Sequence, residues 1–588
     1  MKGTWKILNE IIRKKKSTTM YPETFTHKNK LFTSDLDIAN GFNDFFVNVG
    51  PDLASKIEAP DNVDIDKYLS KSCANSMFLT ATTEEETSKI VNQFDSKIST
   101  DSSNIGMIVV KKVFGAICKP FTNICNQSFV TGVFPDKMKT AKVIPLFKSN
   151  EKNMFTNYRP VSLLSQFSKI LEKLFNNRLD TFLEKNEILV DGQYGFRKAR
   201  STSMAITHLI EELTNANEEK KITVGVFIDL KKAFDTIDHT LLLRKLKHYG
   251  IRGVANNWLE SYLDSRKQFV SLNDCNSDVL NVKCGVPQGS ILGPKLFILY
   301  INDICNVTKI LNFILFADDT NIFCSGKDLK SLCKTVSMEL DKLNVWFAVN
   351  KLSLNVSKTN FILFGNRKHN EDVDITINNV KIDRVYVTKF LGVFIDSNLN
   401  WKEHIDSINN NISKSIAIIY RASKILNTDS LYTLYCTLIL PYLSYCIENW
   451  GNTHESNLSK IILKQKRVIR IISRAKFYDH TNPLFKKLKI LKLKDLVELR
   501  SAIFIYRANC HTLPKNLQSI LNFNTVNKNY NLRNKQDYQH KYVRTKQKQM
   551  CLSIYGIKLW NNLHDDIKQC KHIHSFKTKY KKNLINKY

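Results

Sequence analysis

Two adjacent aspartates stand inside an apolar run that otherwise has the character of a β-strand, in the sequence ILFADDTNIF at residues 314–323. Asp is disfavoured in strands, and neighbouring carboxylates repel each other. A tight turn resolves this conflict, because Asp is a preferred turn residue and a turn lifts both side chains out of the sheet. The run therefore predicts a hairpin with Asp318 and Asp319 at its tip. Such a turn can be purely structural, or it can present both carboxylates to a ligand.

A third aspartate offers these two a partner, since Asp229 ends the apolar strand that we expect at Val224–Ile228. Mg²⁺ is a hard ion that prefers oxygen ligands, and a site for two such ions needs carboxylates from at least two strands. A bound cation also removes the repulsion between Asp318 and Asp319. The three aspartates predict a site for two Mg²⁺ ions, for which Mn²⁺ can substitute.

Strand and helix signals alternate around these aspartates. The segment ITVGVFIDL is typical of a buried strand, HTLLLRKLKHYG of a helix ended by Gly250, and FVSLN of a further strand. This mixed order predicts an α/β fold built around an α+β sheet, not a doubly wound parallel sheet. Near the N-terminus, Ser34 is the expected cap of a helix closed by Gly50-Pro51, and after about residue 400 helix signals dominate.

The charge of the chain points to a polyanionic partner. Its 87 Lys and Arg outnumber its 55 Asp and Glu, for a net charge of +32, and residues 521–588 hold 15 basic residues against three acids. Such a surplus favours nucleic acid first and an anionic membrane second. We expect no membrane association, because no apolar run approaches the roughly 18 residues of a membrane span. The absence of a signal peptide and of CxxC pairs predicts an intracellular location.

Several motifs occur in a characteristic order along the chain, and together they resemble those of reverse transcriptases. The resemblance is closest to non-LTR retrotransposon polymerases of the jockey/CR1-like kind, and it covers nearly the whole chain. The motifs are Asp229 with Phe234, GVPQGS at 285–290, FADD at 316–319, LNVSKT at 354–359 and YVTKFLGVFID at 386–396, with YRPVSLLS and GQYGFRKARST before them, IANGFNDFFVNVG near the N-terminus, and LPYLSYCIENWGN, LKQKRVIRII and YGIKLWNNL behind.

The resemblance implies a right-hand polymerase with fingers, palm and helical thumb. We expect an N-terminal helical module at 1–95, fingers and palm at 96–395, a thumb-like region at 396–500 and a basic C-terminal region at 501–588. The implied activity is RNA-directed DNA synthesis, a two-metal nucleotidyl transfer from dNTPs to a primer 3′-hydroxyl on an RNA template. The expected partners are therefore RNA template, DNA primer or target DNA, and dNTPs.

The resemblance also assigns the catalytic and triphosphate-binding roles. Asp229 and Asp318 would be the metal ligands, with Asp319 as a close helper. Lys358 would protonate the leaving pyrophosphate as a general acid, and its alternative is an ordinary surface lysine. Lys148 and Arg159 would hold the incoming triphosphate, and Arg suits bidentate contact with phosphate.

Three further residues would contact the nascent base pair. Phe234 would be a steric gate that occupies the space of a ribonucleotide 2′-hydroxyl, although core packing is the simpler explanation. Gln288 and Gly289 would lie against the base pair, since Gly permits close backbone approach. Their alternative is a plain turn before a helix that starts near Ser290.

Basic residues elsewhere would contact nucleic acid. Arg197 would touch the template backbone, and a basic amphipathic helix would lay Lys460, Lys464 and Arg467 on phosphates. A solvated face is the alternative for all four. Trp560 could stack on bases, although a core position is the stronger expectation for it.

Three other aspartates, Asp235, Asp238 and Asp303, suit helix caps and solvated faces better than metal binding. The basic clusters RKKK at 13–16 and KQKR at 464–467 suggest nuclear entry, but nucleic-acid-facing charge explains them equally well.

Full-length relatives usually begin with an endonuclease. The first hundred residues here lack an acid/His/Asn cluster for phosphodiester cleavage, so we expect the polymerase and C-terminal parts of an element. A catalytically inert nucleic-acid-binding relic, a group II intron maturase-like enzyme and an RNA-dependent RNA polymerase are the competing hypotheses. Template specificity and oligomeric state do not follow from the sequence.

Overall fold

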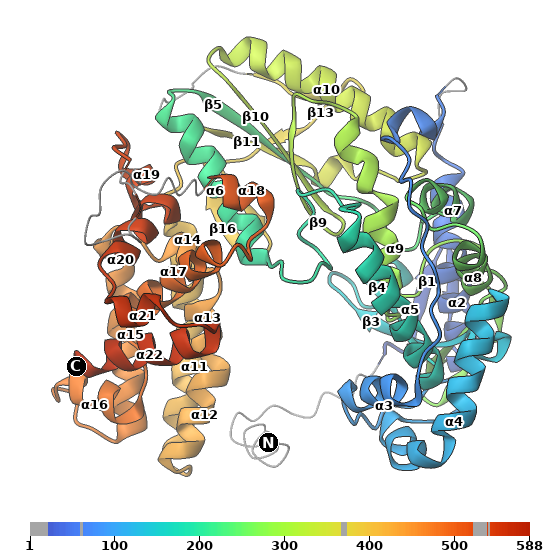
Figure 1. Cartoon of the computed structure of the whole chain (residues 1–588), viewed down its shortest axis with the longest axis horizontal. Helices are drawn as coiled ribbons and strands as arrows, with labels where there is room; N and C mark the ends of the chain where they lie inside the picture. The colour runs from blue at the N-terminus through green and yellow to red at the C-terminus, as the bar shows by residue number, and fades with distance from the viewer. Residues whose placement is uncertain (1–20, 59–62, 366–372, 521–537, 539–540) are drawn as a thin grey trace.

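The computed structural model describes residues 21–58, 63–365, 373–520, 538 and 541–588, and its centre is a five-stranded sheet (Figure 1). We call it the central sheet, and its strand order is β14-β11-β5-β10-β9. The middle strand β5 pairs antiparallel with both β10 and β11. The strands are β5 (Ile222–Ile228), β9 (Asn312–Phe316), β10 (Asp319–Gly326), β11 (Asn360–Phe364) and β14 (Asp383–Arg384).

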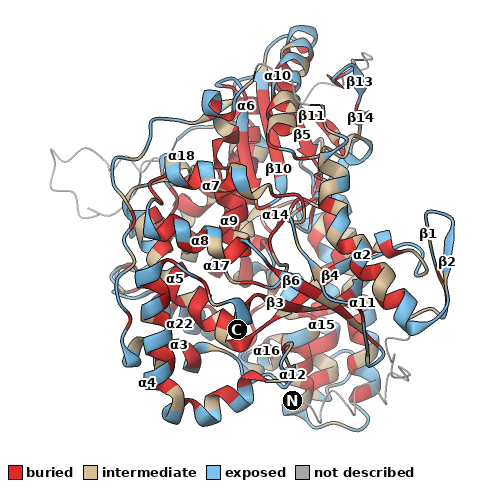
Figure 2. Ribbon diagram, turned by 90° about the vertical axis from the view of Figure 1, so that its right-hand side faces the viewer, coloured by how far each residue is buried: buried red, intermediate tan, exposed pale blue. Residues whose placement is uncertain are grey.

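Both faces of the central sheet are covered, and β5 is accordingly buried at every position and almost wholly apolar (Figure 2). Val224 and Val226 point to the face that helix α10 (Leu329–Val349) covers, whereas Phe227 points to the face that α6 (Thr202–Glu218) covers. Because successive side chains of a strand alternate between faces, one short strand supplies both cores. The buried strand expected at Val224–Ile228 is thus confirmed, two residues longer at its start.

A second sheet lies beside the central sheet and carries the basic residues predicted to bind triphosphate. Its order is β4-β3-β6-β7, with β8 paired to β6, and β3 runs antiparallel to β4 and parallel to β6. The strands are β3 (Thr140–Phe147), β4 (Tyr158–Leu164), β6 (Lys267–Leu272), β7 (Cys275–Asn276) and β8 (Leu280–Asn281). The mixed α/β architecture expected from the sequence is therefore confirmed.

The N-terminal helix α2 (Asp35–Ala54) packs on this second sheet and shares a core with Val143 and Val270. Ser34 caps it as predicted, since its hydroxyl accepts a hydrogen bond from the Asp37 N–H at 3.1 Å. The predicted stop at Gly50-Pro51 is wrong, because the helix continues through both residues. Gly50 instead permits close packing: a methyl group there would lie 2.2 Å from the Asp235 carbonyl oxygen.

Replacing Gly50 with Ala should therefore destabilise the fold, because the clashing atom belongs to a backbone that cannot rotate away. We expect a loss of about 1–3 kcal/mol in the free energy of unfolding, measured by urea denaturation. The matched control is Gly115→Ala in helix α4 (Met107–Thr131), where nothing lies within 4 Å of the new methyl group. The control should gain about 0.5–1 kcal/mol from helix propensity. Equal effects of the two changes would contradict the close-packing explanation.

Helices form the C-terminal half, and they share one core with α6 and the second face of the central sheet. They include α11 (Lys402–Ala422), α12 (Thr428–Leu438), α13 (Leu440–Ser444), α14 (Ile447–Trp450), α15 (Glu455–Ser473), α16 (Thr481–Leu488), α17 (Leu493–Asn509), α18 (Lys515–Ile520), α19 (Lys546–Met550), α20 (Ile557–Asn561), α21 (Asp565–Lys568) and α22 (Ile573–Asn586).

A buried ion pair ties the C-terminal region to α6. Lys548 and Glu211 lie 2.5 Å apart with side chains 7% and 1% exposed. The Ser553 N–H and hydroxyl also donate to the Glu211 carboxylate, at 2.8 and 2.7 Å. Residues more than 300 positions apart in sequence thus complete one polar cluster. The division of the chain at residues 95, 395 and 500 stays a prediction.

The remaining elements are further helices and two-stranded sheets outside the two main sheets. None of the helices in the described ranges combines the length and the apolar character that crossing a bilayer requires. These elements are β1 (Phe25–His27), β2 (Lys30–Phe32), α3 (Glu84–Gln93), α5 (Gln166–Lys185), α7 (His239–His248), α8 (Val254–Leu263), α9 (Gly293–Tyr300), β12 (Thr376–Ile377), β13 (Val380–Lys381), β15 (Val387–Phe390) and β16 (Val393–Asp396), with short 3-10 turns at Ile65–Tyr68, Asp136–Met138, Phe155–Asn157, Asn302–Asn306 and Val356–Lys358 and a π-helical turn at Leu552–Gly556.

Candidate active site

The predicted hairpin exists, and its tip is a two-residue turn. Phe316 of β9 pairs with Asp319 of β10, which leaves Ala317 and Asp318 between the strands. Ala317 adopts a left-handed conformation at φ 55°, which is costly for a residue with a side chain. Its N–H donates to the Gln193 side-chain oxygen at 3.1 Å, and the same oxygen accepts the Gly195 N–H at 2.8 Å. The GQYGFRKARST segment therefore holds the turn in place.

Strand register brings the third aspartate to this tip. Ile228 pairs with Thr320 across β5 and β10, so Asp229 and Asp319 continue the ladder as the next facing positions. The Asn355 amide donates to the Asp229 carboxylate at 2.6 Å, and the Asn355 N–H donates to the Asp229 carbonyl at 2.9 Å. Asn355 belongs to the LNVSKT motif, but we did not predict its role.

The three carboxylates perturb one another. Desolvation, followed by the charges of Asp318 and Asp229, raises the pKa of Asp319 to about 6. The pKa of Asp318 is also raised, by desolvation first and by Asp229 next, while Arg159 and Lys148 act to lower it. Like charges held together in a partly desolvated cleft favour binding of a cation.

Basic side chains face these acids from the second sheet. Lys148 follows β3, and Arg159 lies on β4 opposite Leu146, with both side chains exposed. A third cation, Lys232, lies near both, and its ammonium donates to the Tyr158 carbonyl at 3.1 Å. Burial lowers the pKa of Lys232, and the charges of Lys148 and Arg159 lower it further, whereas the charge of Asp235 acts to raise it. The sequence offered a signal for Lys232, since it lies three residues after Asp229.

A pocket of about 450 Å³ contains Asp229, Asp319 and Lys358 together. Its far wall comes from Thr388, Lys389 and neighbouring residues of the β15–β16 hairpin, which is the YVTKFLGVFID motif. Motifs that are up to 160 residues apart in sequence thus line one space, as their order along the chain led us to expect.

Gln288 and Gly289 lie beside β4 on a loop, and α9 begins only at Gly293, three residues after the predicted start. The Gln288 carbonyl accepts the Ser162 N–H at 2.9 Å. Gly289 has φ 140°, and a methyl group there would lie 2.3 Å from the Ser162 carbonyl oxygen. Close packing against the β4 backbone therefore explains why position 289 requires a glycine.

The predictions for the other aspartates were right for one of three. Asp238 is the N-cap of α7, where it accepts the Leu241 N–H at 2.9 Å. Asp235 is not a cap or a solvated residue: it is half-buried, its carboxylate accepts the Gln288 amide at 2.8 Å, and desolvation raises its pKa. Asp303 is only 2% exposed, because it pairs with the buried Lys245.

Phe234 is half-buried at the edge of the main core. Its ring stacks on Phe297 with centroids 4.6 Å apart and meets Phe196 edge-on at 6.4 Å. The packing alternative therefore holds, and the remaining exposed part of the ring leaves the gate role as a prediction.

Of the basic side chains predicted to contact nucleic acid, some are exposed and others are already hydrogen-bonded within the protein. Lys460 and Arg467 are exposed on α15, but the Lys464 ammonium donates to the Asn409 carbonyl at 3.0 Å and so helps to join α15 to α11. The Arg197 guanidinium donates to the Val190 carbonyl at 2.7 Å. Trp560 is 1% exposed in the C-terminal core, which confirms the core expectation.

The donor set suits Mg²⁺ in its chemistry. The three aspartates offer only oxygen, and the raised pKa of Asp318 and Asp319 marks charge that a cation would relieve. Across the residues that the structure describes, however, no three His, Cys, Asp or Glu side chains are arranged as a metal-binding group. The Asn355 amide holds one oxygen of the Asp229 carboxylate in place by its hydrogen bond at 2.6 Å.

Comparison with known proteins gives this part of the chain a relationship. Residues 148–395 match the family model described as reverse transcriptase (RNA-dependent DNA polymerase).

The relatives narrow the kind of reverse transcriptase further. The chain is 26% identical over 467 residues to the RNA-directed DNA polymerase from mobile element jockey of Drosophila melanogaster, covering 77% of this chain and 51% of the relative. It is 27% identical over 395 residues to the probable RNA-directed DNA polymerase from transposon X-element of the same organism, covering 65% and 42%. The predicted likeness to non-LTR retrotransposon polymerases is confirmed, and the chain spans about half the length of these relatives.

Because the raised pKa of Asp319 reflects unfavourable ionisation, its carboxylate should destabilise the metal-free protein. The folded state binds more protons than the unfolded state between about pH 4 and pH 6, so stability should fall as pH rises through that window. Asp319→Asn should therefore raise stability at pH 8 by on the order of 1 kcal/mol, a value discounted for solvent screening.

Thermal denaturation in the presence of a chelator, at pH 8 and at pH 4.5, measures this effect. Asp274→Asn, at an exposed turn position, is the matched control and should leave the stability unchanged at both pH 8 and pH 4.5. A loss of stability in Asp319→Asn at pH 8 would refute the repulsion argument.

Proposed function

We propose that this protein is an RNA-directed DNA polymerase that transfers nucleotides from dNTPs to a primer 3′-hydroxyl on an RNA template. The observation that carries the proposal is the meeting of Asp229, Asp318 and Asp319 at one sheet edge, faced by Lys148 and Arg159, within a reverse transcriptase domain. The names of the relatives support the same activity. Activity, substrates and partners of the whole protein are part of this proposal.

The aspartates would hold two Mg²⁺ ions, or Mn²⁺ in their place. When bound, such ions lower the pKa of the attacking hydroxyl and neutralise charge on the triphosphate. The chain's own contribution is to keep three carboxylates within reach of one another, through the β5–β10 ladder and the hydrogen bond from Asn355.

The basic side chains complete the proposed chemistry. Lys148 and Arg159 bind the triphosphate, and Lys232 fixes the strand between them through the Tyr158 carbonyl. Lys358, exposed in the pocket of Asp229 and Asp319, donates the proton that the leaving pyrophosphate needs. The C-terminal helices act as a thumb, with Lys460 and Arg467 of α15 turned to nucleic acid.

Asp318→Asn keeps the shape of the turn but removes a charge from the metal site. We expect dNTP incorporation on a primed RNA template to fall by roughly 10³-fold, since several kcal/mol of charge stabilisation are lost. Primer extension with Mg²⁺ measures this, and Asp274→Asn should extend normally. Wild-type protein that binds RNA but extends no primer would favour the inert-relic hypothesis, and equal activity of Asp318→Asn would refute the metal assignment.

Phe234→Val tests the gate separately from its packing. The smaller side chain opens the space of a 2′-hydroxyl, so the ratio of ribonucleotide to deoxyribonucleotide incorporation should rise about 10–100-fold. Loss of packing against Phe297 would lower stability but leave that ratio unchanged. Ribonucleotide use by the wild type would instead favour an RNA polymerase.

Action in the nucleus belongs to the same proposal, because the expected partner is target DNA. Residues 13–16 lie outside the described residues, and the 464–467 cluster is part of α15, where Lys464 already contacts α11. Neither cluster therefore adds structural support for nuclear entry.

A further inference from the structure

The hairpin of β15 and β16 forms the far wall of the pocket that contains Asp229 and Asp319, yet it is not part of the central sheet. Residues 388–391 line that pocket. In the described part of the chain, β15 and β16 form a two-stranded sheet of their own. A two-stranded hairpin is only marginally stable by itself, so contacts with other elements must hold this wall in place.

The tip of the hairpin is a strained turn. Phe390 pairs with Val393, which leaves Leu391 and Gly392 as the two turn residues. Both have left-handed backbone conformations, at φ 45° and φ 84°. Glycine adopts this conformation readily, whereas a residue with a side chain pays a steric cost for it. The turn therefore depends on a contact that stabilises the backbone at Leu391.

The side chain of Tyr445 makes that contact from the helical C-terminal half. Its hydroxyl donates to the Leu391 carbonyl at 2.6 Å. Its ring lies over the next residue, with Cε1 3.4 Å from the position of a methyl group on Gly392. Desolvation raises the pKa of Tyr445, so the hydroxyl keeps the proton that it donates. One side chain thus contacts both residues of the turn.

The rest of the hairpin is held at its base and on its sheet side. Asp396, the last residue of β16, is 6% exposed, and its carboxylate accepts the Trp401 N–H at 2.9 Å immediately before α11. On the sheet side, Phe390 packs on Phe227 of β5 with ring centroids 5.9 Å apart. The hairpin is therefore supported at three places, and the support at the tip comes from Tyr445.

Tyr445 lies between α13 and α14, and this junction is anchored to α6. Glu448 of α14 accepts a hydrogen bond from the Ser203 hydroxyl in the first turn of α6. The buried indole of Trp450 donates to the Tyr445 carbonyl at 2.9 Å. The position of Tyr445 is therefore set from α6.

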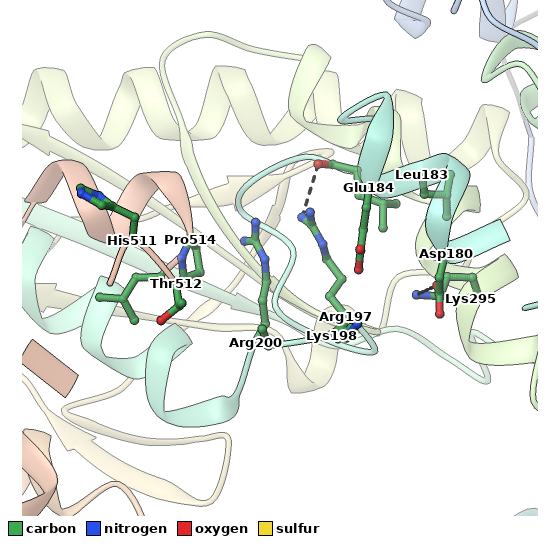
Figure 3. Close-up of a pocket in the computed structure, with 13 residues that line it drawn as sticks. Asp180, Leu183, Glu184, Arg197, Lys198, Arg200, Lys295, His511, Thr512 and Pro514 are labelled. Carbon is green, nitrogen blue, oxygen red and sulfur yellow. Dashed lines mark hydrogen bonds and ion pairs between the residues drawn. The ribbon is translucent and has the colours of Figure 1, made fainter. Parts of the chain in front are cut away.

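The segment before α6 also holds the turn at residues 316–319. Arg197, on the loop that enters α6, donates to the Leu189 carbonyl at 3.3 Å (Figure 3). Gly195, in the same segment, packs so closely on the turn that a methyl group there would lie 2.4 Å from the Ala317 nitrogen. Helix α6 thus connects the turn that carries Asp318 with the support of the far pocket wall.

We propose that Tyr445 is a positioning residue for nucleotide transfer, because it holds the β15–β16 turn, and with it the far wall of the pocket, in place relative to Asp229. Tyr445 acts through the hairpin, since it does not line that pocket itself. The inference rests on the proposed polymerase function for its effect on catalysis, whereas the support of the turn is a property of the fold. Because Lys148 and Arg159 come from the second sheet, Tyr445 should affect the rate of transfer more than the binding of dNTP.

Hydrogen exchange of the protein without metal or substrate tests the support of the turn. Tyr445→Phe removes only the hydroxyl, and the amides of β15 and β16 should then exchange roughly 2–10-fold faster, as expected for one lost hydrogen bond. Tyr445→Leu, which also removes the ring over Gly392, should increase exchange further. The matched control is Tyr442→Phe, because both tyrosines are 41% exposed and lie three positions apart, and it should leave this exchange unchanged. Equal exchange in Tyr445→Phe and Tyr442→Phe would overturn the proposal.

Single-turnover primer extension tests the effect on catalysis, because its rate constant does not depend on the folded fraction. In Tyr445→Phe the rate constant at saturating dNTP should fall about 3–10-fold, since a loosened wall misplaces the reacting groups. The apparent dNTP affinity should stay unchanged, whereas Arg159→Gln should lower that affinity.

Faster exchange with an unchanged rate constant would show that Tyr445 is only structural and would overturn the proposal. If exchange rises as expected but wild type extends no primer, the support of the turn is upheld, whereas the polymerase function, and with it the catalytic part of this inference, is wrong.

Discussion

Three carboxylates that repel one another are held at a single sheet edge, and much of the surrounding structure serves that arrangement. The β5–β10 ladder fixes Asp229 opposite Asp319, while a two-residue turn presents Asp318. Ionised carboxylates in a partly desolvated cleft oppose folding, as the raised pKa of Asp319 records. The opposing terms are the apolar cores on both faces of the central sheet and the cations Lys148 and Arg159.

Close backbone packing, more than side-chain contact, positions the loops around this edge. Gly195 lies against the Ala317 turn, Gly289 against β4, and Gly50 against the Asp235 carbonyl. At each of these glycines the neighbouring backbone leaves no room for a Cβ atom. These segments are therefore positioned by backbone packing, without long side chains that would fill the site. The half-buried amide of Gln288 is in turn fixed by the buried carboxylate of Asp235.

The sequence predicted well what depends on local pattern and motif order. The buried strand β5, the hairpin and the pairing of Asp229 with Asp318 and Asp319 all followed from alternation, turn chemistry and the demand for oxygen ligands. Predictions failed where distant partners decide the outcome. Asp303 is buried together with its partner Lys245, and the helix that continues through Gly50 packs on the backbone of Asp235. No periodicity within either segment carries that information.

The pair of Lys548 and Glu211 has a consequence for how the chain reaches this fold. During synthesis α6 and the middle strand β5 emerge more than 300 residues before the lysine that neutralises the carboxylate buried beside them. Until that lysine arrives, closing the core over Glu211 would leave an uncompensated buried charge, at a cost of about 3–5 kcal/mol. The core over Glu211 can therefore close without that cost only after Lys548 has been synthesised, so a helix from the first half of the chain matures late.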